Sequence, residues 1–273
     1  MKQGVKVAMI IPMKGRIDLI SDLLFSIEVN NSFGINDGNH LDIFIADTGS
    51  SDEEKKLLKS VIKKSKIKDN ISLLEYDYYN FAKINNDVVK NYVSKDTDLI
   101  LLCNNDVQLI NDAISIVVSE YYKHKDVGTV GVLLLYPNLT IQHAGIKYEV
   151  NKEGNPVFGH LRQFSKFKYK SDSRVYRTWG NTGAFMLTSY SDYMRLGGLS
   201  ESYKDCFEDV EYNIRMLFEG RSNYTCLNAL CFHKESETRH QKMSESDIKR
   251  VAELVRLNNR LMGDISVGIH NDL

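Results

Sequence analysis

One apolar segment of this chain ends in side chains that could hold a cation or a phosphate. Residues 98–107 form a Leu- and Ile-rich run that leads into Asn104, Asn105 and Asp106. Such a run predicts a strand buried on both faces of a parallel sheet, and ligands bind at the carboxyl edge of such sheets. We therefore consider Asp106 as a metal or phosphate-site residue. A simple turn or helix cap, which Asn and Asp also favour, is the alternative.

Three further polar clusters follow apolar segments or open a helix. They are Asp47 with Asp52, Glu208 with Asp209, and His233. The strand ends of a twisted parallel sheet meet at one edge, so together these clusters predict an acidic site with an imidazole. A divalent cation is the simplest way to hold such charges close together. Each cluster alone also has a structural explanation. Asp52 could be a helix-turn residue, Glu208 and Asp209 could be favourable charges in the first turn of a helix, and His233 could be structural.

The first half of the chain alternates between segments typical of strands and of helices. The predicted strands are residues 6–12, 41–46, 71–76 and 98–107. The helix after the second strand opens with a capping box, Ser51 with Glu54. We expect this helix to bury Leu57, Leu58, Val61 and Ile62, and the spacing of Phe81, Ile84, Val88 and Tyr92 indicates a third helix. This rhythm predicts a right-handed, doubly wound α/β unit of Rossmann-like type. A Gly-x-Gly-x-x-Gly fingerprint is absent, which argues against a dehydrogenase.

The second half has a different rhythm. The predicted strands are residues 128–136, 141–150, 185–187, 224–227 and 229–232. Three helices are predicted: one that contains Ile114, one at residues 208–219 and one that begins after Ser244. Residues 151–177 are polar and predict a long functional or mobile loop. The last helix has an apolar face of Ile248, Val251, Leu254 and Val255, which packs on the same chain or on a neighbouring subunit in a homo-oligomer.

Composition excludes several classes of protein. The chain has 273 residues, of which 42% are hydrophobic and 26% charged, as expected for one large globular domain. With 35 Lys and Arg against 36 Asp and Glu, it has no general charge excess for nucleic acid or an anionic membrane. Its four cysteines lack the spacing of a zinc site and predict reduced core residues. Because no signal or transmembrane segment is evident, we expect a cytoplasmic protein, either soluble or peripheral at the inner face of the membrane.

The order of these motifs resembles the family 2 glycosyltransferases of the GT-A fold, from residue 7 to about residue 239. The stretch Ile10-Ile11-Pro12 resembles the family's opening strand, and Asp47-Thr48-Gly49-Ser50-Ser51-Asp52 resembles its Asp-x-Gly-Ser-x-Asp nucleotide turn. The helix start Asn80-Phe81-Ala82 with Asn85-Asn86 resembles Gly-Phe-Ala-x-Gly-Asn-Asn, although Asn80 and Ile84 replace the glycines.

The remaining motifs of the family follow in order. Asn104-Asn105-Asp106 stands where the family has its Asp-x-Asp metal motif, in an Asn-Asn-Asp form. Four later stretches of this chain resemble, in order, the downstream blocks of the family: Ile141-Gln142-His143-Ala144-Gly145, Thr182-Gly183-Ala184, Phe207-Glu208-Asp209-Val210-Glu211 and His233-x-Glu235-Ser236. Any one of these motifs is weak evidence, and their order and spacing together are specific.

The resemblance implies one GT-A domain over residues 1–273: a mostly parallel central sheet flanked by helices, with a mixed acceptor-side half and a C-terminal helix. Residues 1–110 would bind the nucleotide sugar, residues 111–240 the acceptor, and residues 241–273 would form a helical tail. The implied reaction transfers a hexose with inversion from a nucleotide sugar to a glycan hydroxyl. UDP is the default nucleotide and dTDP its strongest competitor. The acceptor would be a polysaccharide, a lipid-linked glycan or a glycoprotein.

The resemblance also implies roles on the donor side. Asp47 would hydrogen-bond the nucleobase in a pocket lined by Pro12 and Lys14. Asp106 would bind the Mg²⁺ or Mn²⁺ that bridges the diphosphate, with His233 as a further metal or diphosphate contact. The remaining residues expected to contact substrate are Asn80, Lys83, Asn104, Asn105, Thr182 and Gly183.

On the acceptor side, the resemblance implies that Asp209 is the general base and that Glu208 orients the acceptor. Trp179 packs against a sugar ring or belongs to the core, two interpretations of equal weight. The segment of residues 163–170 is an acceptor lid or a disordered connection.

Two other functions compete with sugar transfer. A nucleotidyltransferase needs a basic, Gly-rich loop after the first strand, whereas this chain has Met13-Lys14-Gly15-Arg16 there. A catalytically silent sugar- or protein-binding module could keep the fold, but the presence of Asp209 together with Asp106 and His233 argues against it.

Overall fold

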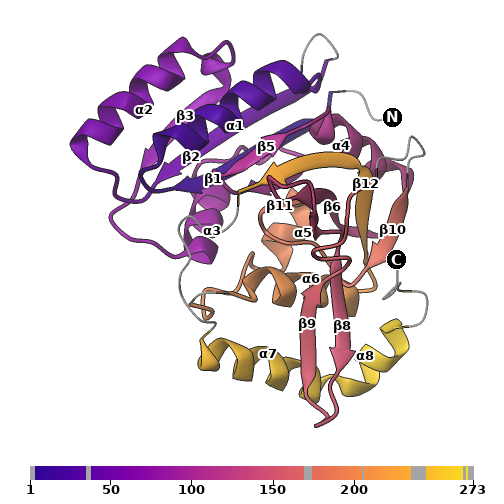
Figure 1. Ribbon diagram of the computed structural model, residues 1–273. Coiled ribbons are helices and arrows are strands. Elements are labelled where there is room, and N and C mark those ends of the chain that lie inside the picture. Colours follow the sequence, from indigo (N-terminus) through magenta and orange to yellow (C-terminus); the bar gives the residue numbers. More distant parts are fainter. Residues whose placement is uncertain are drawn as a thin grey trace.

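The computed structural model describes residues 4–34, 38–168, 174–204, 206–234, 244–266 and 269. A ten-stranded sheet lies at the centre of this described part, in the order β10-β12-β6-β11-β4-β1-β2-β3, with β5 beside β12 and β7 beside β6 (Figure 1). Its strands are β1 (Lys6–Met13), β2 (His40–Asp47), β3 (Ile71–Glu75), β4 (Leu99–Cys103), β5 (Val107–Leu109), β6 (Val127–Leu135), β7 (Ile141–His143), β10 (Val175–Thr178), β11 (Phe185–Ser189) and β12 (Ser222–His233). A separate hairpin pairs β8 (Ile146–Val150) with β9 (Pro156–His160).

Helices cover both faces of the sheet. They are α1 (Ile17–Asn30), α2 (Asp52–Lys64), α3 (Phe81–Asn91), α4 (Ala113–Lys123), α5 (Tyr190–Arg195), α6 (Glu208–Phe218), α7 (Glu245–Leu257) and α8 (Asn259–Ser266), with a short 3-10 turn, η1 (Lys68–Asn70). Alternate residues of β1 enter two different clusters: Met9 packs with α1, α2 and α4, whereas Ile10 packs with α3, α5 and α6. Figure 1 shows α7, α8 and the β8–β9 hairpin at the end of the molecule away from α1 and α2.

The strand directions bring several loops to one edge of the sheet. Strands β1, β2, β3 and β4 are parallel to one another, and β11 runs antiparallel between β4 and β6. Strand β12 is parallel to β6. The carboxyl ends of β2, β4 and β12 and the amino end of β11 therefore lie at the same edge. The prediction of a parallel first half and a mixed second half is confirmed.

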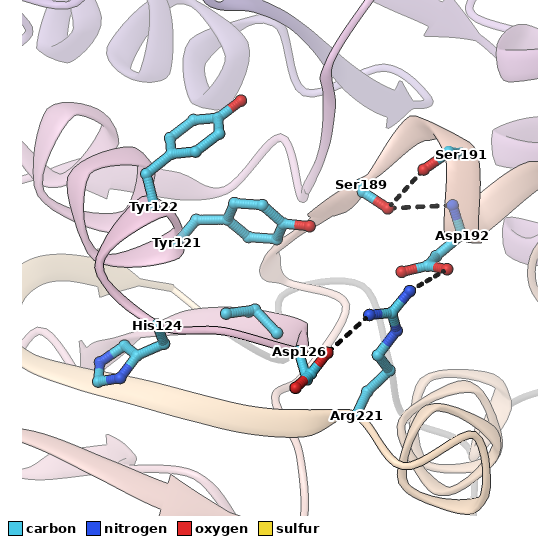
Figure 2. Close-up of a pocket in the computed structure, with 9 residues that line it drawn as sticks. Tyr121, Tyr122, His124, Asp126, Ser189, Ser191, Asp192 and Arg221 are labelled. Carbon is cyan, nitrogen blue, oxygen red and sulfur yellow. Dashed lines mark hydrogen bonds and ion pairs between the residues drawn. The ribbon is translucent and has the colours of Figure 1, made fainter. Parts of the chain in front are cut away.

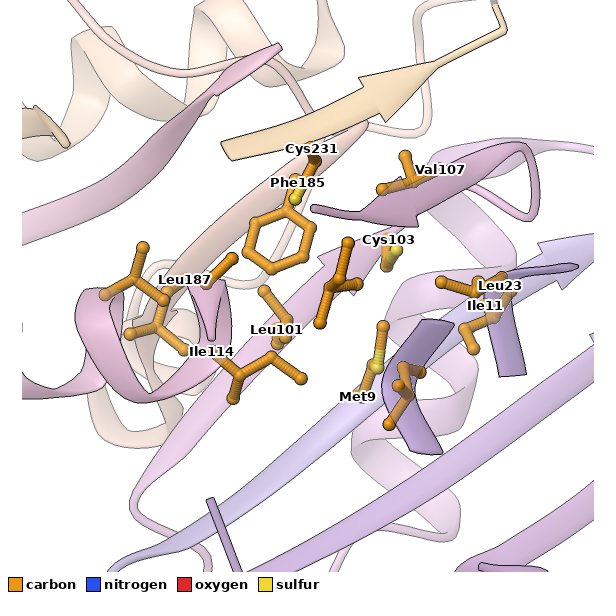
Figure 3. Close-up of a cluster of buried hydrophobic side chains, with 14 of the residues drawn as sticks. Met9, Ile11, Leu23, Leu101, Cys103, Val107, Ile114, Phe185, Leu187 and Cys231 are labelled. Carbon is orange, nitrogen blue, oxygen red and sulfur yellow. The ribbon is translucent and has the colours of Figure 1, made fainter. Parts of the chain in front are cut away.

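The central strand β4 is the most deeply buried part of the predicted site region. All five of its residues are buried, so the apolar run is indeed a strand covered on both faces. Leu101 has no exposed surface and belongs to the same cluster as Met9, Cys103, Ile114 and Leu187 (Figure 3). The buried thiol Cys103, like the other three cysteines, is free, and burial raises its pKa.

Several predicted strand boundaries are wrong. The strand predicted at residues 98–107 is two strands, β4 and β5, separated by a turn at residues 104–106. Residues 141–150 also form two strands, β7 and β8, because Gly145 (φ +112°) turns the chain between them. Residues 224–232 are one continuous strand, β12, with a bulge between Cys226 and Leu230. The predicted loop at residues 151–177 contains β9 and β10, whose pairing partners lie elsewhere in the chain.

The capping box at α2 is confirmed, but part of the burial predicted for the helices is wrong. Ser51 Oγ accepts a bond from the Glu54 N–H, and Glu54 Oε2 accepts one from the Ser51 N–H at 2.8 Å. Leu58 is buried, whereas Leu57 is 54% exposed because it points away from the sheet. Tyr92, predicted to belong to the third helix, lies one residue beyond the end of α3 and is exposed. Val61 and Ile62 are half-buried against the core.

The predicted apolar face of α7 packs on its own chain. Val251 and Val255 are buried in a cluster with Trp179 and Ile214, and Leu254 packs against it. Ile248 is 41% exposed, so that part of the predicted face is wrong. Among the described residues, none of the helices has the length and apolarity required to cross a bilayer.

We predict that Leu101→Ala lowers the free energy of unfolding by about 2–5 kcal/mol, because it opens a cavity in a fully buried strand. The matched control is Leu57→Ala on the exposed face of α2, which should change it by less than about 0.5 kcal/mol. Urea denaturation of both variants measures the difference. Equal losses would contradict the burial assigned to these two leucines.

Candidate active site

The pairing of two strands brings Asp106 and His233 into contact. Val107 of β5 lies opposite His233 of β12, and the Lys234 N–H donates to the Asp106 carbonyl at 3.1 Å. Asp106 Oδ1 is 3.1 Å from His233 Nε2, and Asn104 Nδ2 is 3.3 Å from the same nitrogen. His233 is 7% exposed and Asp106 is half-buried, so a ligand can reach the carboxylate.

The geometry of Asp106 and His233 fits a divalent cation. Two neighbouring ligands of an octahedral ion, each about 2.1 Å from the metal, lie about 3 Å apart, which matches the 3.1 Å between Oδ1 and Nε2. A carboxylate oxygen and an imidazole nitrogen both suit Mn²⁺, and oxygen ligands suit Mg²⁺. Within the described ranges there is no group of three or more His, Cys, Asp or Glu that could hold a metal. This incomplete set suits an ion that is completed by substrate phosphates and water.

Asp209, the second residue of α6, is held by the loop that enters β11. Its Oδ2 accepts from the Gly183 N–H at 2.8 Å, and its Oδ1 accepts from the Val210 N–H at 2.7 Å. The same loop reaches the metal side, because the Asn104 N–H donates to the Ala184 carbonyl at 3.0 Å. Asp209 is half-buried and therefore accessible. Each carboxylate oxygen keeps a second lone pair for a substrate proton.

Two local features shape the surroundings of Asp209, one in the Gly183 loop and one just before α6. A Cβ on Gly183 would lie 3.1 Å from the Phe81 ring, so a larger residue would press on the start of α3. Phe207, which precedes α6, has a left-handed backbone (φ 75°) that is costly for a residue with a side chain. Glu208, the first residue of the helix, is buried at 8% exposure. The strained turn directs Glu208 and Asp209 to different surroundings.

Asp47 lies at the end of β2 with one carboxylate oxygen satisfied and one not. Oδ1 accepts from the Ser50 N–H and hydroxyl at 3.0 and 2.6 Å, and Ser50 Oγ in turn accepts from the Gly15 N–H at 2.8 Å. Oδ2 is buried and has no hydrogen-bond partner among the described residues. A buried, unpaired oxygen costs free energy, so this atom is suited to accept an N–H of a ligand. Pro12 is buried one position before Met13, the residue paired with Asp47.

Other predicted site residues have structural roles or are exposed. Asp52 is exposed in the first turn of α2, in agreement with the helix-turn alternative. Asn80 caps α3, because its Oδ1 accepts from the Lys83 N–H at 2.8 Å. The Lys83 ammonium lies over the Tyr78 ring, 4.5 Å from its centroid. Lys14 is exposed beside the Asp47 loop.

Trp179 belongs to the core. It is 1% exposed and packs edge-on against Tyr148, so its ring has no free face for a sugar and the sugar-stacking interpretation is wrong. Asn105 is half-buried and makes no side-chain hydrogen bond to a described residue, which leaves its amide for a ligand. The motif residues Glu235 and Ser236 and the end of the predicted acceptor segment, Lys170, lie outside the described residues.

A buried network of three asparagines joins the elements around Asp209. Asn213 of α6 accepts from the Asn181 N–H at 3.1 Å and from the Thr129 hydroxyl at 2.7 Å, and donates to the Asn181 and Asp209 carbonyls at 2.8 and 2.7 Å. Asn223 of β12 donates to the Asn213 carbonyl at 3.1 Å. This asparagine network ties the start of α6, and with it Asp209, to the segment before Gly183.

The sequence did not predict the asparagine network because its members come from distant elements. Its only local trace is the glycines that leave it room. A Cβ on Gly131 would lie 2.1 Å from Asn181 Oδ1, and a Cβ on Gly180 would lie 2.3 Å from Asn213 Cγ. Either change would therefore displace a buried amide.

Two residues of β7, Gln142 and His143, also reach the site although the sequence assigned them no role. Gln142 Oε1 is 2.7 Å from His233 Nδ1. His143 is buried, and its Nε2 accepts from the Thr182 N–H at 3.4 Å. Burial lowers the pKa of His143 well below 6.5, and the neighbouring His160 and His233 lower it further. His143 is therefore neutral in the folded protein.

A separate cavity of about 220 Å³ lies at the opposite edge of the sheet (Figure 2). Tyr121, His124 and Ser189 line it, and Arg221 is 3.1 Å from Asp192 within it. It lies where β6 and β12 begin and β11 ends, whereas the residues around Asp106 lie at the other ends of these strands. This cavity is not part of the candidate site.

No family model matches the chain. One curated relative is the O-antigen biosynthesis protein RfbC of Myxococcus xanthus, which is 26% identical over 246 residues. The match covers 89% of this chain but only 18% of RfbC, so the chain spans less than a fifth of the relative's length.

Solved structures show the fold. A mannosyltransferase from Pyrobaculum calidifontis in complex with GDP-Man and Mn²⁺ superposes with a TM-score of 0.61 at 13% identity, covering 98% of this chain and 74% of that one. GalNAc-T7 with UDP, GalNAc and Mn²⁺ superposes with a TM-score of 0.69 at 10% identity, covering 94% of this chain and 50% of that one. S. aureus TarS in complex with UDP-GlcNAc superposes with a TM-score of 0.61 at 12% identity, covering 93% of this chain and 66% of that one. The chain therefore has the GT-A type of fold predicted for it.

We predict that Asn213→Leu lowers the free energy of unfolding by at least about 2 kcal/mol, because the buried Asn181 N–H and Thr129 hydroxyl each lose an acceptor. Asn91→Leu is the control, since Asn91 is exposed and bonds Asp87 on the helix surface. Urea denaturation measures both variants. Similar small changes would show that the asparagine network does not stabilise the fold.

We also predict a pH dependence that comes from His143. Its pKa is lowered in the folded state, so below about pH 6.5 the unfolded chain binds the proton more readily and stability falls as the pH falls. The wild type should lose up to about 1.4 kcal/mol per pH unit more than His143→Gln in this range. Urea unfolding at about pH 7.5 and about pH 5.5 tests this. Parallel pH profiles would contradict it.

Proposed function

We propose that this chain is a metal-dependent, inverting glycosyltransferase. It moves a hexose from a nucleotide sugar, by preference a UDP-hexose, to a hydroxyl of a glycan acceptor in surface polysaccharide or glycoprotein glycan assembly. The observation that carries the proposal is the contact of Asp106 with His233, at the edge of the sheet where Asp209 is held by the Gly183 loop. The similarity to RfbC and to sugar transferases with bound nucleotides and Mn²⁺ supports it.

Asp47 is the residue proposed to recognise the base. The imide N–H of uracil, which thymine shares, donates to Oδ2, the carboxylate oxygen that has no partner among the described residues. The bonds from Ser50 hold the other oxygen and so orient the carboxylate before the base arrives. This arrangement supports UDP or dTDP as the nucleotide.

The diphosphate is proposed to bind beside Asp106 and His233. A bound Mg²⁺ or Mn²⁺ would neutralise the charge that builds up on the departing nucleoside diphosphate. Asn104 donates to His233 Nε2 and lies beside the ion position, and the Asn105 amide is available for ribose or phosphate.

Asp209 is proposed to remove the proton of the attacking hydroxyl. The hydroxyl oxygen must lie roughly 3 Å from a carboxylate oxygen and in line with the bond to the leaving group, which inverts the anomeric carbon. The Gly183 N–H and the asparagine network hold Asp209 in position before the acceptor binds. Glu208, next to it, would orient the acceptor.

The structure offers little support for a nucleotidyltransferase. The short turn at residues 14–16 leads directly into α1, and the Arg16 guanidinium pairs with Asp18 at 2.9 Å. The turn therefore offers only one exposed cation, Lys14, for a triphosphate.

The test of the proposed function is a screen of sugar nucleotides. Release of nucleoside diphosphate is measured for UDP-, dTDP- and GDP-sugars with Mn²⁺, with Mg²⁺ and with EDTA. We expect release from one donor class that EDTA abolishes. If no donor gives metal-dependent release, the chain is a binding module with this fold and the enzyme proposal fails.

We predict that the two aspartates of the site separate catalysis from binding. Asp209→Asn should lower transfer by at least about 100-fold, because the base is lost, while UDP affinity in Mn²⁺ stays within about twofold. Asp106→Ala should also weaken Mn²⁺-dependent UDP binding, by roughly tenfold or more, because a metal ligand is lost.

Transfer assays and calorimetric titration with UDP measure these effects. Asp52→Asn is the control, since this carboxylate is exposed on α2 and should leave both quantities unchanged. Equal losses of nucleotide affinity in the two site variants would contradict the roles assigned to them.

A further inference from the structure

The ring of His233 is held by the side chain of Gln142 on the ring nitrogen that does not face Asp106. Gln142, in the middle of β7, is 1% exposed. Its Oε1 lies 2.7 Å from His233 Nδ1, and its Nε2 donates to the His233 carbonyl at 3.4 Å. The two polar ends of one amide therefore contact the side chain and the backbone of the same histidine.

The chemistry of these contacts determines where the imidazole proton lies. A backbone carbonyl only accepts hydrogen bonds, so the amide nitrogen of Gln142 must face it and Oε1 must face Nδ1. Oε1 also only accepts, so Nδ1 carries a proton. In the neutral ring, Nε2 then carries a lone pair, which accepts from Asn104 Nδ2 at 3.3 Å without an ion and would be given to a cation when one is bound.

This tautomer makes His233 and Asp106 a pair of cation ligands. In it, Nε2 carries no proton and lies 3.1 Å from the carboxylate oxygen of Asp106. Two such atoms repel each other unless a cation or a proton lies between them. With the opposite tautomer, the Nε2 proton would bond Asp106 directly and would occupy the position of the ion.

Strand β7 is fixed on both sides, so Gln142 has little freedom to move. Its neighbour Ile141 lies opposite Leu135 of β6. On the other side, the Ile141 N–H donates to the Ser165 carbonyl and the Phe164 N–H donates to the Ile141 carbonyl, both at 2.8 Å. The amide is thus oriented before any ligand binds.

We propose that Gln142 is a positioning residue that holds His233 in its Nδ1-protonated tautomer, so that Nε2 is directed at a divalent cation shared with Asp106. Metal-bound histidines are generally oriented in this way by an acceptor on the second ring nitrogen, and loss of that acceptor weakens metal binding. This inference rests on the metal site of the proposed function, but not on the identity of the donor or of the acceptor.

The first test reads the tautomer directly. In the metal-free protein, ¹⁵N correlation spectra of the neutral His233 imidazole should show the proton on Nδ1. In Gln142→Met, which keeps the volume and removes the acceptor, the proton should move to Nε2 beside Asp106. In Gln142→Glu, whose carboxylate restores an acceptor, it should return to Nδ1. The same tautomer in all three proteins would overturn the proposal.

The second test measures the affinity for Mn²⁺ alone, from the electron paramagnetic resonance signal of the free ion. Gln142→Met should weaken binding by about 10- to 100-fold, and Gln142→Glu should restore it to within a few-fold of the wild type. Gln163→Met is the matched control, since Gln163 is exposed and bonds only Tyr136 among the contacts described. Equal weakening in the Met and Glu variants, or none in either, would show that Gln142 only fills space.

These outcomes separate this inference from the proposed function. If no sugar nucleotide is a substrate but the tautomer and the Mn²⁺ affinity follow Gln142 as described, the positioning role stands and the proposed transfer reaction fails. If transfer occurs while the tautomer and the Mn²⁺ affinity do not depend on Gln142, the proposed transfer reaction stands and the positioning role fails.

Discussion

The bonds of the buried Asn213 side chain connect the parts of this molecule on which the candidate site depends. One amide joins the start of α6, the segment before Gly183 and the Thr129 hydroxyl of β6. A buried amide is stable only when its partners are in place, so these elements have one mutual arrangement. This arrangement also fixes Asp209, because the Asn213 amide donates to its carbonyl and the Gly183 N–H donates to its carboxylate. The precision with which Asp209 is held therefore comes from the interior of the protein.

Strand pairing organises the other side of the candidate site, which contains Asp47, Asp106 and His233. Asp47 ends a strand of the parallel half, whereas Asp106 and His233 meet because β5 pairs with the end of β12. Between the two sides lies the loop before β11, which bonds Asn104 on one side and Asp209 on the other. At Gly183 of this loop, a Cβ would lie 3.1 Å from the Phe81 ring and 3.6 Å from Asp209 Cβ, so a side chain there would press on its neighbours. The result is a set of charged groups placed close together by a rigid framework, with polar atoms left over for ligands.

Much of the fold could be predicted from the sequence because it depends on local patterns. The apolar run before Asn104 predicted a doubly buried strand, and Ser51 with Glu54 predicted the start of α2 correctly. The patterns failed where burial depends on neighbours. Leu57 has a helical apolar spacing but faces solvent, and Pro156–His160, inside the segment predicted to be a loop, form strand β9 by pairing with β8. Trp179, which could equally have faced a ligand, is enclosed by α6, α7 and β8.

The sequence by itself determined which residue types could do chemistry and which strand ends they follow, since a strand, a cap and a turn depend on neighbouring residues in the chain. It thus indicated Asp47, Asp106, Asp209 and His233 as candidates and predicted the α/β sheet that carries them. Only the tertiary structure decided which of them touch and how each is oriented. The contact of Asp106 with His233, the amide of Gln142 behind that ring and the asparagine network behind Asp209 all join segments far apart in the chain. Such contacts leave no local pattern, because they arise from the packing of whole elements against one another.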